Sequence, residues 1–264
     1  MKKIAILLLA ILTFSCSDDD EKGTEEDKGQ WAMIFNETVK SDSNPVDRTE
    51  KFMFDGERLI QHIIKQRYFE EEINNEVNLS YSDNQVTVTT DYLTLVYTLN
   101  SEGYASQCVY SLSSQNRIYQ FSYSAEGYLT GIVENIDNTE YSSTSLTYEN
   151  GDITSISSKM NGLENKFIYE PGEESSTYHL PCLGLLEIHP LTFHIEALYA
   201  GLLGKDPRHF TMHSCPAGSN DEKTVYSYGF DKKGNPSRMI CQTTYAGGQA
   251  SYYPYTRNIS ISFE

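Results

Sequence analysis

Histidine and cysteine, the residue types that most often bind zinc, gather in one part of this sequence. Five of the six histidines lie in a single segment, at His179, His189, His194, His209 and His213. Cys182 and Cys215 lie within or beside the same segment. A zinc site needs about four nitrogen or sulfur donors in a tetrahedron. Because no two cysteines have the C-x-x-C spacing that favours such a site, we expect no metal and interpret the histidines as scattered over an insert.

Disulfide formation is the second candidate chemistry. Apart from Cys16 near the N-terminus, the chain has an even number of cysteines, namely Cys108, Cys182, Cys215 and Cys241. Cys182 and Cys215 bracket the insert. In the chain-entropy model, a disulfide between them would stabilise the folded protein by on the order of 3 to 4 kcal/mol. Cys108 takes a repeat position that Ile132 and Ile156 occupy elsewhere, so we expect it to be a buried apolar residue.

The sequence has no recognisable enzyme signature. It contains no complete phosphate-binding loop, dinucleotide fingerprint, H-E-x-x-H helix or G-x-S-x-G elbow. A pair among the 37 acids could serve glycoside hydrolysis, but no spacing singles one out. We therefore predict no catalytic residue and no cofactor, and keep a hydrolase of unknown type as an alternative.

Tyrosine is abundant, with 20 copies, and its ring offers an apolar face on which a sugar can stack. Most tyrosines belong to a repeat that places them on the covered face of a sheet. Tyr252, Tyr253 and Tyr255 lie outside that repeat, around Pro254. We predict that these three form an exposed cluster that could bind a glycan.

The repeat that positions most of the chain is clearest in residues 121–133, FSYSAEGYLTGIV. Two aromatic residues stand two apart, a polar run leads to a glycine, and an apolar residue follows. Gly103, Gly127 and Gly151 are spaced 24 residues apart, which indicates one repeated structural unit. Residues i and i+2 of a strand share a face, and glycine suits a tight turn, so each unit predicts a β-hairpin. The fold class is mainly β: antiparallel hairpins in a strongly curved sheet or barrel-like structure.

An apolar insert at about residues 180–215 interrupts the hairpins. Its core, residues 180–203, has only Glu187 and Glu196 as charged residues. Pro181, Pro190 and the polar residues argue against a membrane span and favour a short helix from about Pro190 to Leu203, ended by Gly204. We expect this helix to plug or cap the curved sheet.

The N-terminus predicts export and lipidation. Residues 1–15 have two lysines and then an apolar run too short to cross a bilayer, which is typical of a signal peptide. The sequence before Cys16 resembles a lipobox, which implies that Cys16 is lipidated. Residues 16–30 are acidic and read as a flexible tether, so residues 31–264 form one domain.

The formal net charge is −17, and loss of Lys2 and Lys3 with the signal peptide would make it more negative. Such a body repels nucleic-acid phosphates, so we expect no nucleic-acid partner. The expected partners are the membrane, through the lipid anchor, and a glycan or another surface protein.

Two resemblances extend this reading. Tyr123, Gly127, Leu129 and Ile132 form a pattern similar to the tyrosine-rich YD-type repeats of bacterial surface proteins. With the lipoprotein start and the insert, residues 31–264 resemble a Bacteroides family of unknown function described as having a porin-like fold. The acidic run after Cys16 also resembles the signal that sends Bacteroidetes lipoproteins to the outer leaflet of the outer membrane, which implies a surface-exposed protein.

A transport-related pore is the alternative that this family description raises. A membrane barrel turns an apolar band outward and has strands of about 9 to 11 residues. Here the apolar face is rich in tyrosine and the strands look shorter. We therefore expect a surface-anchored binding or structural module, in which a water-soluble barrel turns its apolar face inward around the insert.

Overall fold

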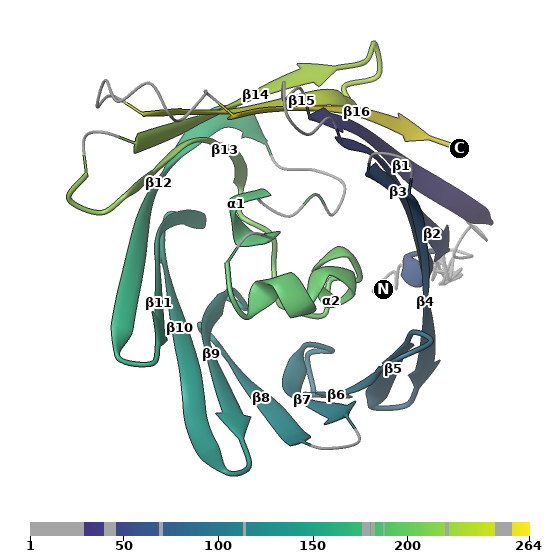
Figure 1. Ribbon diagram of the computed structural model, residues 1–264, viewed down its shortest axis with the longest axis vertical. Helices are drawn as coiled ribbons and strands as arrows, with labels where there is room; N and C mark the ends of the chain where they lie inside the picture. The colour runs from purple at the N-terminus through teal and green to yellow at the C-terminus, as the bar shows by residue number, and fades with distance from the viewer. Residues whose placement is uncertain are drawn as a thin grey trace, which may run out of the picture.

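The structure, a computed structural model, describes residues 29–39, 46–68, 71–112, 115–175, 180, 183–186, 188–219, 222–245 and 255–264. Its sixteen described strands form one closed antiparallel barrel in which neighbours in sequence are neighbours in the wall. Figure 1 looks down the barrel and shows β1 beside β16, where the ring closes. The predicted fold class is confirmed, and the sheet closes completely.

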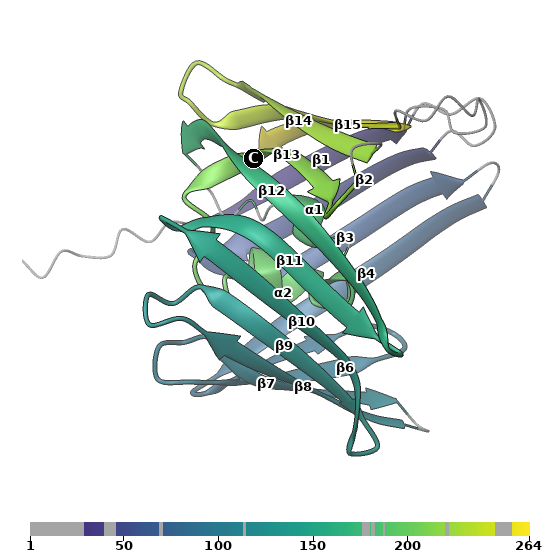
Figure 2. The same cartoon turned by 90° about the vertical axis from the view of Figure 1, so that its left-hand side faces the viewer.

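The first half of the wall consists of β1 (Gln30–Val39), β2 (Val46–Asp55), β3 (Arg58–Tyr68), β4 (Glu71–Ser82), β5 (Gln85–Thr89), β6 (Thr94–Leu99), β7 (Ala105–Leu112) and β8 (Gln115–Tyr123). The second half consists of β9 (Leu129–Ile136), β10 (Thr139–Glu149), β11 (Asp152–Met160), β12 (Leu163–Ser175), β13 (His209–Pro216), β14 (Glu222–Phe230), β15 (Pro236–Tyr245) and β16 (Tyr255–Phe263). The strands run obliquely across the wall in the side view (Figure 2).

The hairpin turns repeat at the atomic level. In the turns after β6, β8 and β14, the side-chain oxygens of Asn100, Ser124 and Asp231 accept hydrogen bonds from the backbone two and four residues later. A glycine with positive φ follows each of them at the third position. The Asn150-Gly151 turn, the strongest turn signal in the sequence, has φ of 53° and 91°, as a two-residue hairpin turn with both residues left-handed requires.

Side chains alternate between a packed apolar interior and an outer wall that carries many polar residues. In β5, Val86 and Val88 are buried while Gln85 is exposed. The outer wall carries cross-strand polar contacts: Thr49 donates to Asn36 Oδ1 at 2.9 Å, and Ser157 donates to Glu164. The apolar face therefore points inward, as the repeat predicts.

The tyrosines of the repeat join neighbouring strands. Tyr123 donates its hydroxyl hydrogen to the Ala105 carbonyl at 2.6 Å, and Tyr81 does the same to Leu59 at 2.8 Å. In each case a ring inside the barrel satisfies a backbone acceptor of the adjacent strand, β7 for Tyr123 and β3 for Tyr81. The tyrosine of the repeat is thus mainly structural, as expected for a side chain with an apolar body and a polar tip.

The insert lies inside the barrel and we call it the plug (Figure 1). It contains α1 (Leu183–Leu186), the 3-10 turn η1 (Leu191–Phe193) and α2 (Ile195–Tyr199). The single helix expected from Pro190 to Leu203 is shorter, because Gly201 already has φ of 69° and ends the helical path before Gly204. The plug ends before His209, so the insert we placed at about 180–215 includes one wall strand, β13.

The two ends of the barrel differ. The repeat rim carries the turns after β2, β4, β6, β8 and β10 as well as the start of β1 and the end of β16. The far mouth carries the turns after β9 and β11 and the start of β16. Since β1 starts at the repeat rim, the N-terminal segment joins the barrel at that end. No helix among the described residues is long and apolar enough to cross a membrane.

Candidate functional site

A buried carboxylate fixes the plug to the wall near the far mouth. Glu134 of β9 has no exposed side-chain surface. It accepts hydrogen bonds from Ser142 at 2.7 Å and Tyr119 at 3.1 Å, and it pairs with Arg117 at 3.2 Å. His189 of the plug reaches the same carboxylate, with 2.6 Å between Nε2 and Oε2.

The surroundings of Glu134 keep it charged. Burial opposes ionisation, but hydrogen bonds from His189 and Ser142 outweigh it and lower the pKa of Glu134. Arg117 lies 5.9 Å from the ring centroids of both Tyr110 and Tyr141, within the range of a cation-π contact. This arrangement holds a charge inside the barrel and ties the plug to a group of side chains from three neighbouring strands, β8, β9 and β10.

A second carboxylate and histidine group fixes the other side of the plug. His62 of β3 has no exposed surface and contacts Glu196 of α2 at 2.8 Å and Glu50 of β2 at 3.1 Å. Burial opposes its protonation, but the two carboxylates outweigh this effect and raise the pKa of His62. Two carboxylates therefore converge on His62. Because both contact the histidine and its ring is fully buried, the group is suited to holding the plug in place and not to reaching a ligand.

His194 of the plug lies at the centre of the core. Its Nδ1 is 2.8 Å from the Tyr97 hydroxyl, and its ring stands perpendicular to that of Tyr119 at 4.4 Å. Burial lowers the pKa of His194 to about 3, so the ring is neutral. Nearby Cys108 is buried, and burial raises the pKa of its thiol to about 12. The interpretation of Cys108 as a buried apolar residue is confirmed.

The last part of the plug runs along the repeat rim and joins successive hairpins. Leu202 accepts from Ala105 N at 2.7 Å, Lys205 N donates to the Gly127 carbonyl at 2.9 Å, and Arg208 N donates to that of Gly151 at 3.1 Å. Each step of three residues in the plug therefore reaches the next hairpin of the wall. Figure 2 shows the plug helices enclosed by the tilted strands.

An open hollow of about 720 Å³ lies where this segment meets the turns after β8 and β10. Its lining includes Tyr128, Tyr148, Asn150, Lys205 and Arg208. The two tyrosine rings stack with 5.0 Å between centroids. We call this the rim hollow, and it combines aromatic, amide and cationic groups in one concave surface.

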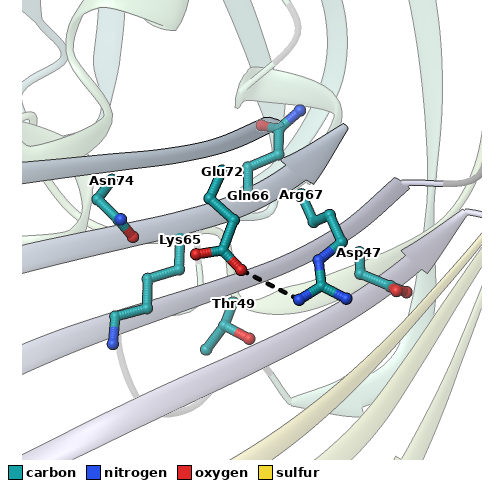
Figure 3. Close-up of a pocket in the computed structure, with 7 residues that line it drawn as sticks. All are labelled: Asp47, Thr49, Lys65, Gln66, Arg67, Glu72 and Asn74. Carbon is teal, nitrogen blue, oxygen red and sulfur yellow. Dashed lines mark hydrogen bonds and ion pairs between the residues drawn. The ribbon is translucent and has the colours of Figure 1, made fainter. Parts of the chain in front are cut away.

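A second hollow, of about 280 Å³, lies on the outer wall over β2, β3 and β4. Figure 3 shows its polar lining, with Arg67 paired to Glu72 at 3.0 Å across the strands. Both side chains are about two-thirds exposed, at 64% and 63%, so the pair contributes little to stability. The hollow is shallow and polar, and it illustrates the chemistry of the outer wall.

The far mouth carries most of the exposed large apolar side chains among the described residues. Ile73, Tyr92, Met160 and Leu163 lie at or near its turns, and Phe193 of the plug is 41% exposed beside His189. The Glu134 group lies just inside. This end therefore offers a mixed apolar and charged surface on the side away from the N-terminal strand end.

The predicted site residues fall mostly outside the described part of the chain. Cys16, Cys182, Tyr252 and Tyr253 lie outside it, and Tyr255 is described only as the start of β16 at the far mouth. Cys215 lies on β13 opposite Ile168, at an outward-facing register position, and forms no disulfide with a described residue. The Cys182–Cys215 bond and the tyrosine cluster stay predictions.

The histidines of the insert are dispersed rather than convergent. His209 contacts Asp152 at 2.9 Å, and His213 contacts Glu170 at 2.9 Å on the outer wall. His189 and His194 have separate partners in the core. Within the described ranges, no three histidine, cysteine, aspartate or glutamate side chains are arranged to hold a metal ion.

Few sequence signals identify the residues that form these groups. Glu134 and Glu50 are two acids among 37. Glu134 does occupy an inward register position beside Ile132, and a charged residue at an apolar position of a strand is the signal that could have identified it.

The wall of hairpins is closed, and polar contacts hold the plug inside it. The protein is therefore an antiparallel β-barrel with a filled interior. The chain belongs to the family described as a domain of unknown function (DUF4595) with porin-like fold, which matches residues 52–238. The suspected family is confirmed. The porin-like fold suggests an outer-membrane-type protein.

Solved structures agree with this assignment. A porin-like protein from Bacteroides uniformis shares 27% sequence identity with a TM-score of 0.79, covering 88% of this chain and 96% of that one. A porin-like protein from Bacteroides vulgatus, at 12% identity and a TM-score of 0.54, covers 87% of this chain and 97% of its own and shows likeness of fold alone. A comparison with curated proteins gives no match.

Proposed function

We propose that this protein is a lipid-anchored, surface-exposed outer-membrane protein whose barrel stands in water and acts as a binding or structural module. Cys16 carries the lipid, and residues 16–30 connect it to the barrel. The ligand is a glycan or another surface protein. The carrying observation is the orientation of the wall: its apolar core lies inside, and polar side chains such as those of Ser145 and Ser260 occupy outward positions in the middle of strands.

Polar outward positions support a barrel that stands in water. A lipid-facing wall presents apolar side chains along the middle of each strand. Here the outward residues in the middle of β10 are Ser143, Ser145 and Thr147, and those of β16 are Asn258 and Ser260. Placing such groups in hydrocarbon would cost several kcal/mol wherever they lack a partner, at roughly 2–7 kcal/mol each.

The filled interior argues against the pore alternative. A porin keeps a polar, water-filled lumen. In this barrel the plug residues Leu191, Ala197 and Tyr199 are buried against the inward side chains of the wall. Charged contacts at Glu134 and His62 fasten the plug from two sides.

Membrane fractionation of full-length protein and a Cys16→Ala variant tests the proposal. We expect the wild type to incorporate radiolabelled palmitate and to sediment with the outer membrane. The variant should lose the label and appear in the soluble periplasmic fraction, because lipid is its only attachment. If the variant stayed in the membrane after carbonate extraction, the barrel itself would be inserted and the proposal would fail.

A further inference from the structure

We propose that the rim hollow binds an acidic oligosaccharide, with Lys205 and Arg208 holding its carboxylate groups and Tyr128 and Tyr148 contacting its sugar rings. This assignment rests on the proposed binding function and gives it a site and a ligand class. The site lies at the repeat rim, whereas Tyr255, the one described residue of the predicted tyrosine cluster, starts β16 at the far mouth.

Charge is the first argument. The chain has 37 acidic residues against 20 lysines and arginines, yet two exposed cations of the plug line this one hollow. Lys205 and Arg208 make no side-chain hydrogen bond or ion pair with any residue in the described part of the chain. A concave surface that gathers cations on an acidic protein attracts anions locally.

The lining contains one carboxylate, Glu126, which faces Lys205. A hydrogen bond from Ser124 and the charge of Lys205 lower the pKa of Glu126, so it is ionised at neutral pH. The hollow thus has two cations and one hydrogen-bond-accepting anion. This combination suits a ligand that carries both carboxylates and hydroxyl groups, because Glu126 can accept from a hydroxyl while Arg208 binds a carboxylate in bidentate fashion.

The cations are held in place by the fold. The backbone N–H groups of Lys205 and Arg208 bond the carbonyls of Gly127 and Gly151. A Cβ built on Gly151 would lie 3.0 Å from Arg208 Cδ and 2.7 Å from the Tyr128 hydroxyl. Arg208 and Tyr128 therefore close over the same glycine turn, and only glycine leaves them room.

Size and lining favour sugar rings over a lone anion. The hollow, at about 720 Å³, falls within the range of about 300–1,000 Å³ that is usual for small-molecule sites. The stacked, half-buried rings of Tyr128 and Tyr148 supply flat apolar surface beside the polar side chains of Asn150 and Thr130. Apolar faces flanked by hydrogen-bonding groups match the two sides of a sugar ring.

Calorimetric titration of the full-length lipoprotein, in a detergent without sugar groups, tests the assignment. The probes are trimers of galacturonate, guluronate and mannuronate, each beside its carboxyl-reduced neutral form. We expect at least one acidic trimer to bind at least tenfold more tightly than its neutral form. Binding should weaken with added salt, because exposed charges are screened.

Variants locate the binding. Arg208→Gln and Lys205→Gln should each weaken the acidic trimer at least fivefold, because each removes a charged hydrogen-bond donor. Arg238→Gln is the matched control, since Arg238 is also an exposed arginine but lies on the outer face of β15. It should bind the trimer as the wild type does. Circular dichroism of each variant checks that the barrel has folded.

Several results would overturn the assignment. They are no binding by any acidic trimer at millimolar concentration, equal binding of acidic and neutral forms, or equal losses in the Arg208→Gln and Arg238→Gln variants. Arg208-dependent binding to phosphatidylglycerol vesicles in place of the sugars would make the site a lipid headgroup site instead. None of these results bears on the fractionation of Cys16→Ala, so a failed ligand assignment is distinguishable from a failed anchoring proposal.

Discussion

Replacing Glu134 by glutamine should destabilise the barrel strongly, because this carboxylate joins the plug to the wall. The amide keeps the volume of the side chain, but its single oxygen can keep only one of two acceptor sites, because Ser142 donates to Oε2 of Glu134 and Tyr119 to Oε1. It also loses the negative charge that faces Arg117 and His189. The variant therefore removes the charge and one acceptor site without changing the size of the side chain.

The structure sets the size of the effect. Removing one partner of a buried ion pair usually costs about 3–5 kcal/mol. Arg117 and His189 keep 23% and 25% of their side-chain surface exposed, so water can partly solvate them once the charge is gone. We therefore expect a loss of about 2–3 kcal/mol in the free energy of unfolding, at or just below the bottom of that range. For a domain of this size that corresponds to roughly 4–12 °C in Tm.

Urea and thermal unfolding, followed by circular dichroism, measure this loss. Glu72→Gln is the control, because it removes a carboxylate from an exposed pair with Arg67, and it should change stability by less than about 0.5 kcal/mol. The pKa of Glu134 is lowered in the folded state, so its contribution is present above the ordinary pKa of 4.5 and lost as pH falls through the folded value. The gap between wild type and variant should close in acid. Equal stability of the two variants at neutral pH would refute the assigned role of Glu134.

Three further predictions concern the backbone, pH and cysteine chemistry. Gly204→Ala should lower the free energy of unfolding by more than about 2 kcal/mol, against about 1 kcal/mol for Gly162→Ala. Both glycines have positive φ, but only at Gly204 would a Cβ lie 2.6 Å from a backbone oxygen. Equal losses of the two variants in urea denaturation would contradict this. The pKa of His62 is raised above 6.5, so its stabilisation is complete below that pH and lost as pH rises through the folded pKa. Tm should thus fall above neutral pH in the wild type and stay flat in His62→Gln, and parallel curves would argue against the assignment. Cys108, with the pKa of its thiol near 12, should react with Ellman's reagent only after unfolding; rapid reaction in the native protein would show that the site opens to solvent.

Local sequence signals predicted the hairpins well. The turn at Asn150-Gly151 and the spacing of Gly103, Gly127 and Gly151 reflect steric rules that act within a few residues. Alternation in strands such as β5 then fixed which face is buried. Closure of the barrel cannot be predicted in this way, because the pairing of β1 with β16 joins residues more than two hundred positions apart and has no local signal.

The fastening of the plug could not be predicted in the same way. His62 and Glu196 are 134 residues apart, and Glu134 and His189 are 55 apart. Nothing in the spacing of such residues along the chain says that they meet. The helix was also overextended in the prediction, because apolar composition continues through Leu202 and Leu203 although Gly201 has already ended the helical path.

Labelling of single cysteines on the outer wall tests the central claim most directly, namely that the outside of the barrel faces water. Thr87→Cys, Ser143→Cys and Ser260→Cys each place a thiol at an outward position within a strand. In whole membranes containing the anchored protein, made permeable to reach both sides, a charged maleimide should label all three to an extent similar to that after detergent solubilisation. If the three cysteines reacted with the maleimide only after detergent solubilisation, lipid would cover the outer wall. That result would contradict the account.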